Sequence, residues 1–239
     1  GVAISNAAFP RMTERLAEGR VDLFKKELRS VFRWIVWLAL PIAVITFFAR
    51  GYVVAFIKNG GQPAIASVLG ALVISIFFRT LYHIMARTFY AQQDTRTPLY
   101  ISIATISLNI LLAIVFTQLF GWGVFGLAWA QSIVSVVEIA ILLTILHVRT
   151  PGIFNRKTLR SIITMMIASV IMGVVTYFVV QMLQLQSRDM NFMAVFPKFT
   201  VIVVVSFAVY IALSKVFKLE EADPIVAKLR QLLFGRVRR

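Results

Sequence analysis

Three basic residues lie on one face of a predicted membrane helix, where charge is energetically unfavourable. Arg79, His83 and Arg87 follow one another at intervals of four residues, the spacing that places side chains on the same side of an α-helix. A charge near the middle of a bilayer costs at least about 2.5 kcal/mol, so Arg79 is expected to face protein or water. This face is either a cationic wall that receives an anionic substrate group, or a structural feature in which a neighbouring helix neutralises Arg79 and Arg87 reaches the headgroups.

A single carboxylate lies inside another predicted span. Glu138 shares a helical stripe with Gln131 and Ser135, and a rise of about 1.5 Å per residue places it about 20 Å deep, as it does Arg79. The two charged side chains are therefore able to pair, either as a structural clamp or as a gate that opens during transport. Asn109, in the intervening span, is interpreted as a polar contact between helices rather than a ligand site.

The rest of the sequence argues against other kinds of chemistry. The chain has no Cys, and His83 and His147 are too far apart in sequence to suggest a metal pair. There is no nucleophile elbow, no glycine-rich phosphate loop and no plausible carboxylate pair, so we expect neither an enzyme nor a cofactor. A net charge of +15 would suit nucleic-acid binding in a soluble protein, but basic loops between membrane spans explain it better.

The composition is that of a membrane protein. Of the 239 residues, 59% are hydrophobic and 15% are charged, and the mean hydropathy is +0.85. Soluble domains are only about 45–50% apolar, whereas about 20 consecutive apolar residues form a helix that crosses a bilayer. We therefore predict an all-α, polytopic fold with about six spans, over Trp34–Phe48, Ala66–Tyr90, Leu99–Leu119, Phe125–Leu146, Ile162–Leu183 and Phe199–Leu213, with Phe192 as an alternative start of the last.

Amphipathic segments precede and follow these spans. Arg11–Arg33 carries apolar residues at intervals of three to five, which predicts a helix on the membrane surface. After Lys215 the chain becomes polar, and Ile225 and Leu229 share a face opposite Lys228, which predicts a second surface-lying or soluble helix.

Prolines and polar residues indicate where helices begin or bend. Pro63 and Pro98 suit first turns, with Thr97 as a cap, and Pro41 predicts a kink inside the first span. The fifth span contains Met165, Met166, Met172 and Gly173, and the sixth is almost entirely aliphatic and aromatic. Composition alone favours ordinary lipid-facing helices here over an apolar groove for a lipid tail.

Lys and Arg are distributed unequally between the two ends of the spans. Twenty lie on one side and only Arg50, Lys58, Arg188 and Lys198 on the other, with Arg79 inside the membrane. Basic residues are retained in the cytoplasm, so the pattern predicts a cytoplasmic C-terminus. Residues 1–10 lack an initiator Met and a signal peptide, so we expect further helices before them.

The stretch Arg87–Pro98, RTFYAQQDTRTP, resembles the segment that ends a helix of the C-terminal lobe in the MurJ/MviN family of lipid II flippases. Gln92 and Gln93 replace the small residues most common in that family. The resemblance extends to Ala8–Met12, to Leu40-Pro41 and to Gly123–Ala128. Beyond His147 only the pattern of two extra hydrophobic helices matches.

This resemblance implies helices nine to fourteen of a fourteen-helix transporter of the multidrug/oligosaccharidyl-lipid/polysaccharide exporter superfamily. Such a transporter moves an undecaprenyl-linked peptidoglycan precursor across the bacterial inner membrane by alternating access. Much of its cationic site belongs to an N-terminal lobe outside this sequence. Among the motif residues Arg87, Tyr90, Asp94, Thr95 and Pro98, the first three are expected to pack and shape the cytoplasmic gate, and the last two helices to form a groove for the lipid tail.

The same resemblance suggests a division of the chain into four parts. Residues 1–33 are the end of a preceding helix and a cytoplasmic amphipathic segment, 34–147 a four-helix part of the C-terminal lobe, 148–217 two additional spans, and 218–239 a cytoplasmic basic tail. The expected partners are the precursor lipid, membrane lipids and the N-terminal lobe, without nucleic acid. Two alternatives stay open, a sister exporter of other polysaccharide lipids or drugs and a non-transporting membrane scaffold.

Overall fold

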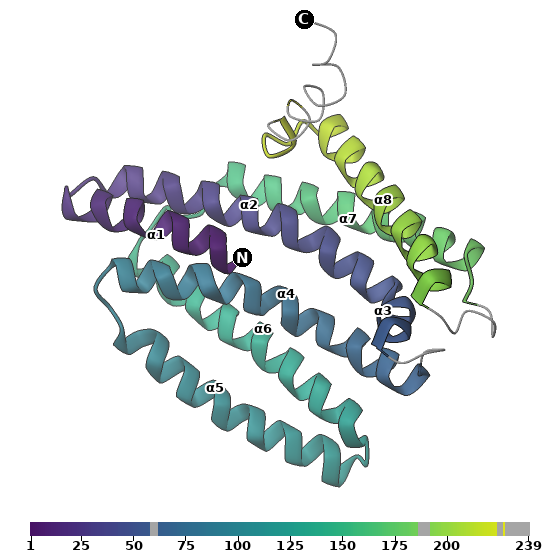
Figure 1. Cartoon of the computed structure of the whole chain (residues 1–239). Helices are drawn as coiled ribbons and strands as arrows, with labels where there is room; N and C mark the ends of the chain where they lie inside the picture. Colours follow the sequence, from purple (N-terminus) through teal and green to yellow (C-terminus); the bar gives the residue numbers. More distant parts are fainter. Residues whose placement is uncertain (58–61, 186–191, 224–226, 228–239) are drawn as a thin grey trace, which may run out of the picture.

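The protein is built from long helices that run side by side (Figure 1). The computed structural model describes residues 1–57, 62–185, 192–223 and 227. The helices in these ranges are α1 (Val2–Ala17), α2 (Val21–Phe48), α3 (Arg50–Ile57), α4 (Pro63–Ala91), α5 (Arg96–Ile114) with the π-helical η1 (Val115–Leu119), α6 (Gly123–Arg149), α7 (Arg156–Met182) and α8 (Phe192–Val216). Within the described chain, six helices are long and apolar enough to cross a membrane: α2, α4, α5 with η1, α6, α7 and α8. The predicted all-α, six-span fold class is confirmed.

Most helices extend beyond the predicted spans at one or both ends. Pro63 occupies the first turn of α4, as expected, and α5 begins at Arg96, three residues before the predicted start. Apolar composition reports only the part of a helix inside the bilayer, whereas polar residues are equally able to continue the backbone hydrogen bonds. The predicted breaker at residues 59–61 and the predicted tail helix around residues 225–233 lie outside the described residues.

The predicted surface helix over Arg11–Arg33 is wrong. α1 ends before a turn at Gly19, where φ is +71°, and α2 then continues without interruption into the first span. Three of the apolar side chains that suggested a membrane-facing stripe, Met12, Phe24 and Leu28, are 0% exposed and lie inside the protein, whereas Val21 is 43% exposed. An amphipathic pattern does not distinguish a face against lipid from a face against neighbouring helices.

The tightest association of two spans is between α4 and α6, with α5 on the outer side of α6 (Figure 1). Small residues contribute to this seam: the hydroxyls of the buried Ser75 on α4 and Ser135 on α6 lie 3.1 Å apart, and Ala71 and Ala128 are buried on the same two helices. Small side chains allow helix backbones to approach closely in a membrane. The Ser132 hydroxyl also donates a hydrogen bond of 2.6 Å to the carbonyl oxygen of Ala71, so polar and steric contacts hold the same pair of helices together.

Polar contacts between largely apolar surfaces attach α8 to α2 and to α7. The Trp37 indole on α2 donates to the Ser214 hydroxyl of α8 over 3.1 Å. Between α7 and α8, the hydroxyls of Thr176 and Ser206 lie 2.8 Å apart in a buried environment. Each contact satisfies polar groups that would otherwise face hydrocarbon.

One side of α7 faces the helix bundle rather than lipid. Met165 and Met172 are 0% exposed, and a Cβ added at Gly173 would lie 3.1 Å from a methyl group of Val44. Met166, in contrast, is 53% exposed. The lipid-facing interpretation of this span is therefore wrong for the buried positions, because composition averages over all faces of a helix.

Gly126 on α6 lies close to Phe116 of η1, and this contact provides a test of the helix packing. An added Cβ would lie 2.9 Å from the Cβ of Phe116 and 3.1 Å from its backbone. Relieving this contact would require the backbone of α6 or η1 to shift, which is energetically unfavourable. We expect Gly126→Ala to lower the free energy of unfolding by about 1–3 kcal/mol through overpacking, measured as the Tm of the purified protein in detergent. Gly51→Ala is the control, because its new methyl group would meet only Leu185 at 3.7 Å. Equal Tm values for the two variants would contradict the prediction.

Candidate functional site

A polar cavity of about 210 Å³ lies between α4, α5 and α6, within the predicted membrane region. Its polar lining residues are Arg79, Tyr82, Ser102, Thr105, Asn109, Gln131 and Glu138. The cavity therefore brings together Arg79 and Glu138, the two charged residues that helix geometry placed at the same depth.

Glu138 is held by hydroxyl groups from α5. Its Oε1 atom accepts hydrogen bonds from Ser102 Oγ at 3.2 Å and from Thr105 Oγ1 at 3.3 Å. The Tyr82 hydroxyl on α4 lies 3.1 Å from Ser102 Oγ. Because the single hydroxyl hydrogen of Ser102 is directed to Glu138, Tyr82 is the donor in this second contact. A continuous chain of hydrogen bonds thus joins α4, α5 and α6.

Arg79 and Glu138 share the cavity without forming an ion pair. In the part of the chain that the structure describes, no carboxylate oxygen lies within 4.0 Å of the Arg79 guanidinium. The Arg79 side chain is exposed, whereas that of Glu138 is half-buried. The clamp that the sequence allowed is absent from this conformation, and Arg79 instead offers its charge to the cavity.

The cavity does not include the other two basic residues of the α4 face. His83 is exposed, with its ring 6.1 Å from that of Tyr82. Arg87 lies over the ring of Phe9 on α1, 5.4 Å from the ring centre. Eight residues span about 12 Å along a helix, so a shared face does not imply a shared site.

Two features of the cavity differ in how well the sequence predicted them. The Asn109 amide donates to Gln131 over 3.1 Å, which confirms its interpretation as a contact between helices. Tyr82, Ser102 and Thr105 were not recognised as site residues, because hydroxyl-bearing residues are common in membrane helices. The spacing of Ser102 and Thr105, three residues apart, was the available signal that both face one partner.

The loop between α4 and α5 is organised by Asp94. Its Oδ1 atom accepts hydrogen bonds from the backbone N–H groups of Arg96 at 3.1 Å and Thr97 at 3.0 Å, and Oδ2 accepts one from Thr97 Oγ1 at 2.5 Å. The prediction that Thr97 caps the helix is wrong, because α5 begins at Arg96 and Thr97 already lies in its first turn. The carboxylate of Asp94 satisfies the free N–H groups at this helix start.

Asp94 also connects this loop to the end of α6. The Arg149 guanidinium forms an ion pair with Asp94 and donates to Thr97 Oγ1 over 3.0 Å. It also lies 6.0 Å from the centre of the Phe89 ring. The hydrogen bonds from Thr97, together with those from Arg149 and its positive charge, lower the pKa of Asp94 from 3.8 to about 2. The loop is thereby fastened to two helices.

The remaining motif residues surround this loop without entering the polar cavity. Tyr90 is 38% exposed, Thr95 is exposed and Pro98 is buried in the first turns of α5. The family motif therefore describes the connection between α4 and α5, whereas the cavity lies further along these helices. No group of three or more potential metal ligands occurs within the described ranges.

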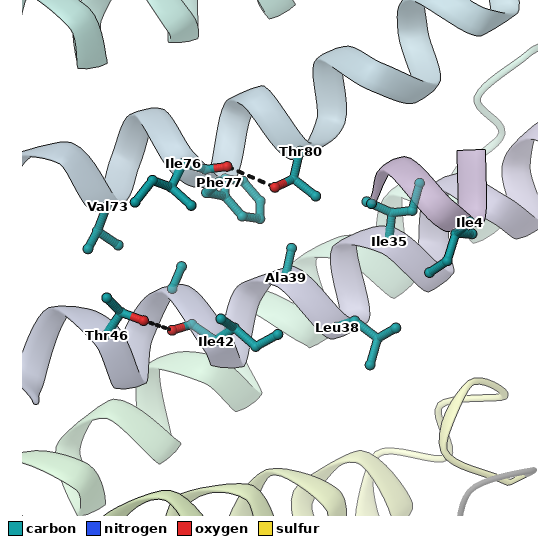
Figure 2. Close-up of a pocket in the computed structure, with 12 residues that line it drawn as sticks. Ile4, Ile35, Leu38, Ala39, Ile42, Thr46, Val73, Ile76, Phe77 and Thr80 are labelled. Atoms are coloured by element: carbon teal, nitrogen blue, oxygen red, sulfur yellow. Dashed lines mark hydrogen bonds between the residues drawn. The ribbon is translucent and has the colours of Figure 1, made fainter. Parts of the chain in front are cut away.

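An apolar cavity of about 240 Å³ separates part of α2 from α4 (Figure 2). Ile4 of α1 contributes to its lining. The hydroxyls of Thr46 and Thr80 donate to the carbonyl oxygens of Ile42 and Ile76, at 2.7 and 2.8 Å. Because these hydroxyl hydrogens are used within their own helices, the surface suits hydrocarbon better than a polar group.

A larger apolar cavity of about 570 Å³ lies between α2, α4, α6 and α7. Phe32, Phe78, Leu143, Ile162 and Met166 represent its lining. Helix α7 contributes to this surface, but α8 does not, because α8 packs against α7 and the far side of α2. The groove that the last two helices were expected to form together is not this cavity.

These observations define a multi-pass α-helical membrane protein with a charged cavity among its spans, as is typical of transporters. The sequence model of the family described as lipid II flippase MurJ matches residues 1–219. The chain therefore belongs to the MurJ family of lipid II flippases, which are transporters.

Comparisons with individual proteins agree with this family. The chain is 25% identical over 234 residues to a probable lipid II flippase MurJ of Thermotoga maritima, covering 95% of the chain and 44% of that protein. It is 25% identical over 182 residues to a counterpart from Vibrio cholerae, covering 72% of the chain and 34% of that protein. The chain thus spans less than half the length of these relatives.

A solved structure of lipid II flippase MurJ in an inward closed conformation has the same fold. It superposes with a TM-score of 0.71 at 19% sequence identity, over 90% of this chain and 42% of that one.

The Asp94 contacts predict a defined pH dependence of stability. Because its pKa in the folded protein, about 2, lies below the ordinary value of 3.8, the carboxylate adds stability above about pH 5 that is lost as the pH falls towards 2. We expect Asp94→Asn to destabilise the protein by about 1 kcal/mol at pH 7 and to flatten the decrease in Tm between about pH 5 and pH 3.

The control for this experiment is Asp223→Asn, which changes an exposed carboxylate with no ion pair among the residues described. Its Tm should follow that of the wild type at every pH. If Asp94→Asn gave a curve parallel to the wild type, the proposed role of the carboxylate would be refuted.

Proposed function

We propose that this chain is the C-terminal part of a lipid II flippase, which moves an undecaprenyl-linked peptidoglycan precursor across the bacterial cytoplasmic membrane by alternating access. The observation that carries the proposal is the match of residues 1–219 to the lipid II flippase family. An N-terminal lobe outside this sequence would form the other half of the transport path. The chemistry is the movement of a lipid, so no catalytic residue or cofactor is required.

Arg79 is the residue of this chain best suited to meet the anionic part of such a substrate. Its guanidinium lines a membrane cavity and has no carboxylate partner in the described ranges. Guanidinium groups bind phosphate oxygens through paired, charge-assisted hydrogen bonds. Oε1 of Glu138 already accepts hydrogen bonds from Ser102 and Thr105, so the proposed role of this residue is to hold α5 and α6 together beside the cavity.

The remaining parts of the chain have proposed roles at the edges of the path. Arg87 packs on α1, and His83 is exposed on the same side of α4, so we assign them to the cytoplasmic gate together with the Asp94 loop. The apolar cavity beside α7 offers a surface for a lipid tail. We retain the proposed division of the chain into a four-helix part of the C-terminal lobe at residues 34–147 and two additional spans at 148–217. A cytoplasmic basic tail follows them.

The alternatives have less support. A sister exporter of other polysaccharide lipids or drugs would share the fold, but the family match names lipid II flippases. A drug exporter would also be expected to carry acidic rather than basic cavity residues. A scaffold would not need a cation such as Arg79 without an ion-pair partner in the described chain, since placing such a charge within a membrane is costly.

Complementation tests the proposal. In a host depleted of its own lipid II flippase, the full-length gene carrying this chain should restore growth and the outward appearance of lipid II. We expect Arg79→Ala to reduce transport by roughly 10- to 100-fold, the equivalent of one charge-assisted contact of about 1.5–3 kcal/mol. Glu138→Ala should also reduce transport, because the Tyr82–Ser102 chain loses its acceptor.

The matched controls are Arg160→Ala and Glu14→Ala, which remove the same charges from exposed positions. Both should complement like the wild type when membrane insertion is equal. Failure of a well-inserted wild type would shift the assignment to a sister exporter or a scaffold. Full activity of Arg79→Ala would remove this residue from the transport site.

A further inference from the structure

A second charged cavity, of about 500 Å³, lies at the end of the bundle where α2 and α7 begin and the chain leaves α8. Its charged lining residues are Lys26, Arg29, Arg33, Lys157, Glu220 and Glu221. Four basic groups meet two carboxylates, which leaves an excess of positive charge. The cavity is separate from the polar cavity around Arg79.

Part of this charge is neutralised within the protein. Arg33 of α2 pairs with Glu221 and, at 2.9 Å, with Glu220, and Lys157 of α7 contacts Glu220 at 2.6 Å. The hydrogen bonds from Lys157 and Arg33 lower the pKa of Glu220 below its ordinary value. These contacts fasten the segment after α8 to α2 and α7 and form one wall of the cavity.

The excess positive charge comes from Lys26 and Arg29. Neither forms an ion pair with a carboxylate in the described part of the chain. Arg29 donates one hydrogen bond of 3.1 Å to the backbone carbonyl oxygen of Gly152, which fixes the side chain but leaves its charge uncompensated. Two neighbouring cations in this arrangement favour an anionic ligand.

Glu221 belongs to the neutralised wall of the cavity. The side chain is 3% exposed, Oε1 contacts Arg33, and Oε2 is buried without a hydrogen-bond partner among the described residues. Because Oε2 has almost no accessible surface, a ligand in the cavity does not reach it. The ligand therefore has to compensate Lys26 and Arg29 with an anionic group such as a phosphate ester.

The position of the cavity distinguishes a membrane lipid from a soluble phosphate. Trp34 lines the cavity at the point where the apolar part of α2 begins, and Trp is enriched where helices pass the headgroups. Basic pockets between membrane helices on the cytoplasmic side are sites for phospholipid headgroups. By the distribution of Lys and Arg, this end of the bundle faces the cytoplasm.

We propose that this cavity binds the headgroup of an anionic phospholipid from the cytoplasmic leaflet. The phosphate lies between Lys26 and Arg29. The lipid would thereby connect α2, α7 and the segment after α8, the elements that enclose the cavity.

Lipid titration of the full-length protein in neutral detergent tests this site. The probe is dioleoylphosphatidylglycerol, with dioleoylphosphatidylcholine for comparison, and the Kd is measured by native mass spectrometry. We expect Lys26→Gln/Arg29→Gln to weaken phosphatidylglycerol binding at least about tenfold, and Lys26→Gln alone to leave the lipid-free Tm unchanged. Lys26→Gln alone should give part of the loss, because Lys26 has no ion pair in the described chain to break.

The matched control is Arg160→Gln/Lys215→Gln, which removes the same charge from exposed positions outside the cavity. It should bind phosphatidylglycerol like the wild type. Equal weakening in the control pair, or none in either Lys26 variant, would overturn the proposal. Inorganic phosphate that raises the Tm as much as the lipid, and only when Lys26 and Arg29 are intact, would assign the site to a soluble anion instead.

Discussion

The close packing of α4 against α6 is the constraint on which the polar cavity depends. The small residues Ser75 and Ser135 meet between the two helices, and the bond from Ser132 to the Ala71 carbonyl fixes their alignment. Arg79 and Glu138 reach one cavity because these two helices are held side by side. Bulkier residues in the seam would move the charged side chains apart without changing either one.

The charged groups discussed above are of two kinds: some belong to hydrogen-bond or ion-pair networks, and others have no carboxylate partner in the described chain. Glu138 is integrated into a hydrogen-bond network across three helices, whereas Arg79 has no carboxylate partner in the described ranges. At the end of the bundle, Arg33 is paired with Glu221 and Lys26 is not paired with any carboxylate described. Charges that are networked stabilise the helix arrangement, and those without partners are available for a ligand.

The last two spans are attached to α2 by contacts between residues far apart in the chain. Trp37 hydrogen-bonds to Ser214, and Arg33 pairs with Glu221, although 177 and 188 positions separate the partners in the sequence. Helices α8 and α4 lie on different sides of α2 (Figure 1). This attachment places α8 outside the apolar cavity that α7 lines, and it brings the segment after α8 to the second charged cavity.

The sequence alone determined the all-α class, the six spans and the equal depth of Arg79 and Glu138, because these follow from local hydropathy and the fixed rise of a helix. The motif around Asp94 also indicated the family. Tertiary structure decided which face of each helix is covered, so it alone showed that Arg87 packs on α1 and that Met172 is buried. Helical periodicity gives the faces of a helix, but the neighbour that each face meets depends on contacts between residues far apart in sequence.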